Sequence, residues 1–75
     1  MSNRITCDPQ IMGGRACIRG MRITVALVVN LVANGRTTQE ILTEYPDLEA
    51  EDIREALRYV AWLATEEIHP LRVAG

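Results

Sequence analysis

Residues 37–67 read TTQEILTEYPDLEAEDIREALRYVAWLATEE, and this pattern predicts two helices joined by a short turn. The motif TTQE at residues 37–40 is a capping box, in which a threonine accepts from a backbone amide and the glutamate reaches back, so the first helix starts near Thr38. It ends at Tyr45, because Pro46 forces the residue before it out of the helical region. The expected inner face of this helix consists of Ile41, Leu42 and Tyr45.

The last helix is expected to run from about Ala50 to Glu67. Glu49, Glu51 and Asp52 lie at its start, where carboxylates interact favourably with the helix dipole. Apolar residues then recur at steps of three and four, which is the spacing of one helix face. We expect that face to be buried, and it consists of Ile53, Ala56, Leu57, Val60, Ala61 and Ala64.

The segment before these two helices combines β-prone runs with one more helix. Residues 4–7 and 16–18 are short β-prone runs separated by glycine turns, which predicts a pair of short strands or a ribbon completed by a second subunit. Residues 25–34 contain four valines, which favour a strand, but the length of the run favours a helix ended by Gly35. The predicted fold is therefore mainly α, with three helices preceded by short N-terminal β-strands.

The helix expected at residues 25–34 is apolar around most of its circumference and must be covered on two sides. A chain of 75 residues has few elements to supply both covers, so we expect the second cover to come from another copy in a homodimer. The alternative is a fully central helix in a monomer. The residues expected at the dimer interface are Val25, Leu27, Val28, Leu31 and Val32.

The length of the chain limits it to one domain. Its first ten residues lack the apolar run of a secretory signal, so we expect a cytoplasmic protein in which Cys7 and Cys17 are buried, reduced thiols. The longest apolar run is about eleven residues, well short of the ~20 that a membrane span needs. The expected parts of the domain are a β and turn element at residues 1–24, a three-helix bundle at 25–67 and a tail at 68–75.

Charge is distributed unevenly along the chain. Up to residue 36 there are five arginines against one carboxylate, whereas nine carboxylates face three arginines in the remainder. Such polarity fits a protein that meets an anionic partner with its N-terminal part and a basic partner with its C-terminal part. The alternative is that these charges are scattered over a solvated surface.

The order of several short motifs resembles that of the DUF433 family. The opening motif is DPQIMGGRACIRGMRITV at residues 8–25, followed by NG at 34–35, ILTEYPDL at 41–48 and DIREAL at 52–57. The resemblance implies a homeodomain-like helix-turn-helix preceded by a β element. It also implies a role like that of a VapB-type antitoxin, which pairs with a PIN-like nuclease toxin and represses its own promoter as a dimer.

In a helix-turn-helix protein the start of the second helix of the motif meets the DNA bases. Here that start is acidic, which is unfavourable beside phosphates. If operator DNA is bound, we therefore expect N-terminal arginines to contact it, and the alternative is that they pair with the acidic C-terminal half. The arginines expected at DNA are Arg15, Arg19 and Arg22, with Arg4 and Arg36.

A protein partner is expected at the aromatic edge of the last helix. Tyr59 and Trp62 lie three residues apart beside Leu63, off the strip expected to be buried. An acidic and apolar segment of this kind suits a basic partner such as a nuclease. The alternative is that the two rings simply close the core. The residues expected at the partner are Tyr59, Trp62, Leu63, Glu66 and Leu71.

Catalysis is not expected. His69 is the single histidine and lies beside Pro70, and no serine or cysteine nucleophile has a recognisable partner nearby in the sequence. We expect no cofactor, no metal and no small-molecule substrate. An orphan dimeric DNA-binding regulator, or a structural interaction module without a toxin, is the alternative to an antitoxin.

Overall fold

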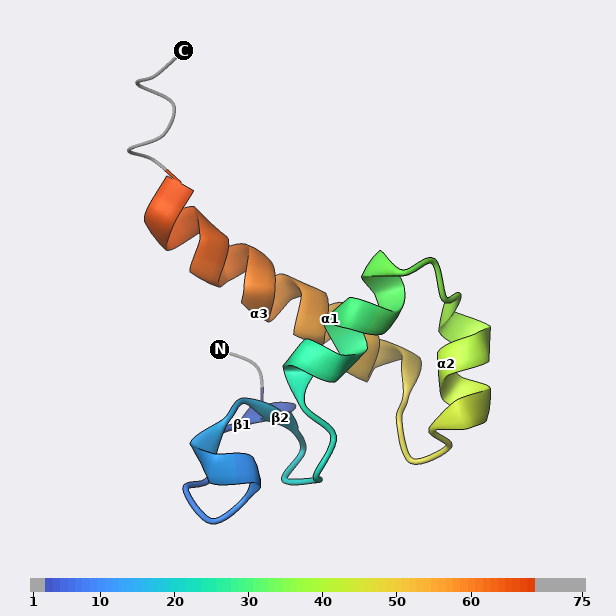
Figure 1. The fold of residues 1–75 in the computed structure, drawn as a ribbon, viewed down its shortest axis with the longest axis horizontal. Helices are drawn as coiled ribbons and strands as arrows, with labels where there is room; N and C mark the ends of the chain where they lie inside the picture. The colour runs from blue at the N-terminus through green and yellow to red at the C-terminus, as the bar shows by residue number, and fades with distance from the viewer. Residues whose placement is uncertain (1–2, 69–75) are drawn as a thin grey trace.

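The computed structural model describes residues 3–68 and is mainly helical, as predicted (Figure 1). Two short strands and one 3-10 turn form the N-terminal element, and three helices follow. The elements are β1 (Ile5–Thr6), the 3-10 turn Met12–Gly14, β2 (Cys17–Ile18), α1 (Val25–Ala33), α2 (Thr38–Glu44) and α3 (Ala50–Ile68).

The two strands pair with each other within one chain. β1 and β2 are antiparallel, with Ile5 opposite Ile18 and Thr6 opposite Cys17. Arg19 follows β2 in a left-handed conformation at φ 46°, which is rare for a residue with a side chain. Its backbone amide donates to the carbonyl oxygen of Arg4 at 2.8 Å, so the turn after β2 is fixed to the strand beside it.

Helix α1 begins and ends with specific hydrogen bonds. The hydroxyl of Thr24 accepts from the amide of Leu27, which satisfies one free donor of the first turn. At the other end Gly35 adopts φ 88° and donates to Val32 O, while Arg36 donates to Leu31 O. This pair of bonds is a Schellman motif, and its glycine confirms the predicted stop.

Helix α2 confirms the predicted capping box. Thr37 Oγ1 accepts from the amide of Glu40, and Glu40 Oε1 accepts from the amide of Thr37. The bond from the Thr37 amide is the main reason that the pKa of Glu40 lies below its usual range. The helix ends at Glu44, one residue before Tyr45, which lies outside the helical region at φ −123° and ψ 78° before Pro46.

The core lies where α1 crosses the first half of α3, with α2 and the strands beside it (Figure 1). Cys17 is buried in this region, but Cys7 is exposed, so the prediction of two buried thiols is wrong for Cys7. Cys7 follows β1 at the start of the loop, where no core element covers it. The buried apolar residues of the core cluster are Ile5, Ile18, Val25, Val28, Ile41, Leu48, Ile53 and Ala56.

Candidate interaction surface

The start of α3 carries a buried carboxylate held by two arginines. Asp52 is fully buried, and Arg19 meets it with two nitrogens, Nε at 3.0 Å from Oδ1 and Nη2 at 2.8 Å from Oδ2. Arg4 Nη1 donates to Oδ1 at 2.8 Å, and the backbone amide of Glu49 donates to Oδ2 at 2.8 Å. Arg19 Nη2 also donates to the carbonyl oxygen of Asp47 at 2.8 Å. These bonds fasten the N-terminal element to α3.

The hydrogen bonds decide the ionisation of this site. Burial by itself would raise the pKa of Asp52, but bonds from Arg19, Arg4 and the Glu49 amide outweigh it and lower that pKa from 3.8 to about 2. The pKa of Arg4 is raised, first by its bond to Glu49 and then by that to Asp52. The pKa of Arg19 is raised chiefly by its bond to Asp52. Asp52 is therefore a carboxylate throughout the neutral range.

Two of the arginines expected to contact DNA are instead paired within the chain. Arg4 and Arg19 are pairing partners of the acidic C-terminal half, which is the alternative that the sequence left open. The carboxylates at the start of α3 are also neutralised, because Glu49 pairs with Arg4 and Glu51 pairs with Arg54. The sequence left this pairing open as an alternative but did not identify Asp52 as the buried acceptor of Arg4 and Arg19.

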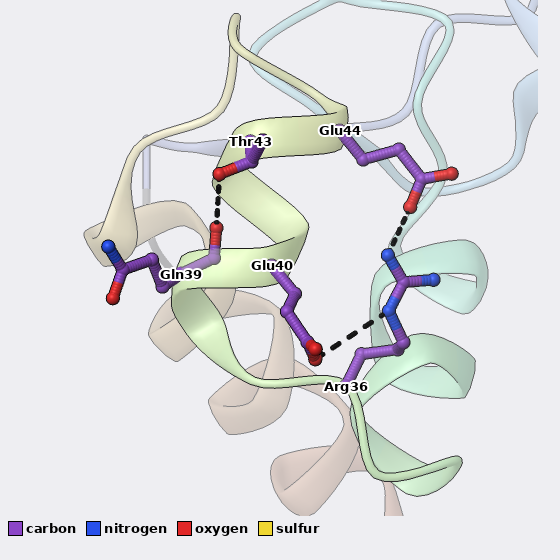
Figure 2. Close-up of a pocket in the computed structure, with 5 residues that line it drawn as sticks. All are labelled: Arg36, Gln39, Glu40, Thr43 and Glu44. Atoms are coloured by element: carbon purple, nitrogen blue, oxygen red, sulfur yellow. Dashed lines mark hydrogen bonds and ion pairs between the residues drawn. The ribbon is translucent and has the colours of Figure 1, made fainter.

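Arg36 is likewise paired within the chain. Figure 2 shows its guanidinium between two carboxylates of α2 in a shallow surface hollow. It contacts Glu44 through Nη2 and Glu40 through Nε at 3.8 Å, and the bond to Glu44 is the main cause of its raised pKa. Gln39 and Thr43 complete the lining. These side chains line the hollow, which is open to solvent rather than enclosed.

Arg15 and Arg22 differ from the other predicted DNA contacts. Both are exposed, and within residues 3–68 neither makes an ion pair or a side-chain hydrogen bond. Arg15 follows the 3-10 turn, and Arg22 lies in the loop between β2 and α1. They are the two arginines of the predicted set whose charge faces solvent.

The apolar face of α3 is buried only in its first half. Ile53 and Ala56 are 4% and 0% exposed, as predicted. Leu57 and Val60 are 38% and 36% exposed, and the alanines at 61 and 64 are also exposed, so the prediction of burial is wrong for these four residues. The reason is visible in Figure 1, where the orange and red half of α3 extends past α1 and α2. The four uncovered residues, called the outer stripe below, are Leu57, Val60, Ala61 and Ala64.

The predicted partner surface also lies on this projecting half. Trp62 is 51% exposed and Leu63 is 42% exposed. Tyr59 is half-buried and packs against the core, and its ring centroid lies 6.3 Å from that of Trp62. We call Tyr59, Trp62 and Leu63 the aromatic face. Leu71 lies outside the described residues, and the structure does not describe the side chain of Glu66.

The residues of α1 that were predicted at a dimer interface fall into a buried group and a half-buried group. Val25 and Val28 are 3% and 0% exposed because they lie in the core of the single chain. They have no surface to offer a second copy. Leu27, Leu31 and Val32 are half-buried and retain part of their surface.

No helix in the described part of the chain combines the length and apolarity needed to cross a membrane. Within the same residues, no three histidine, cysteine or acidic side chains gather in a way that could hold a metal ion.

Comparison with known proteins places this arrangement in a family. The sequence profile described as "Protein of unknown function (DUF433)" matches residues 5–60. The crystal structure of a DUF433 member protein from Anabaena variabilis superposes with a TM-score of 0.77 at 35% identity, covering 87% of this chain and 64% of that one. The uncharacterized protein y4eO of Sinorhizobium fredii is 38% identical over 68 residues, which are 91% of this chain and 28% of that protein. The chain belongs to the DUF433 family.

Proposed function

We propose that this protein is an antitoxin-like binding module that holds a PIN-like nuclease on the aromatic face of α3. The observation that carries the proposal is the exposure of Trp62 and Leu63 on a part of α3 that extends past the other described elements. Tryptophan and tyrosine are among the residues that most often dominate the binding energy of protein interfaces. The choice of a PIN-like nuclease as the partner follows from the role that the sequence resemblance implies, that of a VapB-type antitoxin.

The charge near this face supports a basic partner. The last turn of α3 contains Glu66 and Glu67 in its sequence, and no basic residue lies in that turn. A nuclease must attract RNA to its active site and therefore carries positive charge there. An apolar helix with acidic neighbours complements such a surface and speeds association with it.

The proposal predicts that a neighbouring gene encodes a PIN-like protein, and the test is the binding of this chain to that protein; a gene with no such neighbour would contradict the proposal. Truncating Trp62 and Leu63 together to alanine is expected to raise the dissociation constant at least about 100-fold, because it removes the apolar anchors of the interface. Isothermal titration calorimetry measures the change. Met12→Ala is the matched control, since Met12 is an exposed apolar residue far from α3 along the chain. Unchanged affinity in the double variant would refute this use of the aromatic face.

Operator DNA is a second candidate ligand. What favours it is that Asp52 is buried and paired and that Glu49 and Glu51 are neutralised, so the start of α3 repels phosphate less than the sequence indicates. Arg15 and Arg22 would then contact the backbone. In this reading the chain is a DNA-binding regulator, with or without a toxin.

Replacing Arg15 and Arg22 by alanine is expected to weaken binding to the protein's own upstream DNA and to lower its salt dependence. Each lost phosphate contact reduces the slope of log K against log salt by about 0.9, so two contacts per chain reduce it by about 1.8. Fluorescence anisotropy over a salt series measures both quantities. Arg58→Ala is the control, because Arg58 is exposed and already paired with Glu55. An unchanged slope in the double variant removes these arginines from the DNA site.

A further inference from the structure

The outer stripe and the aromatic face lie on different sides of α3. A helix turns by about 100° per residue, so the outer stripe and the aromatic face have centres roughly 150° apart around the axis. The outer stripe continues the line of Ile53, which is buried, into a region where the chain no longer covers it. One apolar face thus extends beyond the cover that a single chain provides.

We infer that a second copy of this chain covers the outer stripe, with the two α3 helices antiparallel. A two-fold axis between Val60 and Ala61 gives a consistent register for the pair. It places Leu57 of each copy opposite Ala64 of the other, and Val60 opposite Ala61. Every larger side chain then faces a small one, which is the pattern that fills the space between two facing helices.

Charge supports the same register. It brings Arg54, whose side chain is 60% exposed, opposite position 67 of the other copy, which the sequence fills with glutamate. Arg54 pairs with Glu51 of its own chain at the surface, and an exposed pair of this kind is exchanged at little cost. A parallel pair would instead place Arg54 against Arg54 and Leu57 against Leu57. The antiparallel pair is therefore the complementary one.

This contact replaces α1 as the place where two copies meet. Val25 and Val28 belong to the core, whereas all four residues of the outer stripe are exposed in the single chain. The inference goes beyond the proposed function, because the aromatic face stays open on the other side of α3. A dimer built in this way presents two aromatic faces.

Sedimentation equilibrium of the full chain at micromolar concentrations tests the inference. The wild type is expected to be a dimer. Ala61→Glu places a charge at the two-fold axis and is expected to raise the dimer dissociation constant at least about 100-fold. Its fold is expected to remain intact by circular dichroism, because Ala61 is exposed on α3. Trp62→Ala, one residue away on the aromatic face, is expected to leave the dimer unchanged.

A charge exchange tests the register. Arg54→Glu alone is expected to weaken the dimer about three- to tenfold, and Glu67→Arg added to it is expected to restore the affinity. A monomeric wild type, or a dimer that survives Ala61→Glu, would overturn the interface. If Glu67→Arg does not restore the dimer affinity lost in Arg54→Glu, the antiparallel register is wrong. Neither result depends on whether a nuclease binds, so failure here is distinguishable from failure of the proposed function.

Discussion

Replacing Asp52 by alanine is expected to lower the free energy of unfolding by about 3 kcal/mol, because it removes the buried acceptor that two arginines and a backbone amide share. Asp52 accepts from Arg19, Arg4 and the amide of Glu49, so one substitution removes several of the bonds between the N-terminal element and α3. A domain of this size has a total stability of roughly 4–11 kcal/mol. The loss is therefore a large part of what holds the chain folded.

Urea unfolding followed by circular dichroism measures this change. Asp47→Ala is the matched control, since its side chain is exposed and Arg19 uses only its backbone oxygen. The control is expected to change the free energy of unfolding by less than about 0.5 kcal/mol. If Asp52→Ala is no more destabilising than the control, the network does not stabilise the fold.

The same carboxylate makes stability depend on acid. The pKa of Asp52 is about 2 in the folded chain and 3.8 without its partners, so the unfolded chain binds its proton first as the pH falls. The stability that Asp52 contributes is complete above pH 3.8 and is lost as the pH approaches 2. The loss amounts to about 2 kcal/mol, since each pKa unit corresponds to about 1.4 kcal/mol.

Unfolding measured from neutral pH down to about pH 2 tests this linkage. The difference in stability between the wild type and Asp52→Ala is expected to shrink as the pH falls. Protonation of Asp52 removes from the wild type the stabilisation by the carboxylate that the variant already lacks. Comparing the two chains cancels the titration of the other carboxylates. A difference that stays constant over this range would show that Asp52 titrates alike in the folded and unfolded chain.

Local signals predicted the elements of this fold well. The TTQE motif at residues 37–40, Gly35 and Pro46 each act through backbone geometry within a few residues, and all three do what the sequence predicts. The strand pair was predicted for the same reason. Elements of this kind depend on neighbours in the sequence, which a single chain shows directly.

Local signals could not predict how much of α3 is covered by the other elements of the chain. Periodicity gives the direction of an apolar face but not the length over which other elements lie against it. Leu57 and Val60 continue the spacing of Ile53, yet α1 has nine residues and covers the first half of α3 only. The sequence therefore predicted burial of the second half of α3, whereas the structure leaves that half exposed to solvent.

The burial of Asp52 was not predicted, because a carboxylate at the start of a helix has two possible roles. A carboxylate there can face solvent and interact with the helix dipole, or it can turn inward and accept bonds. The available signals for the second role were its position one turn before Ala56 and its place three residues after Glu49, from which a carboxylate can accept from the amide at the helix start. Its arginine partners lie 33 and 48 residues away, so the sequence could not name them.

The free energy of unfolding of Trp62→Ala tests most directly whether the second half of α3 serves binding rather than folding. Trp62 is 51% exposed, and we expect a loss of less than about 1 kcal/mol, with the far-ultraviolet spectrum unchanged. A loss of about 3 kcal/mol or more is what removal of a core tryptophan causes, and that result would show that Trp62 serves folding rather than binding.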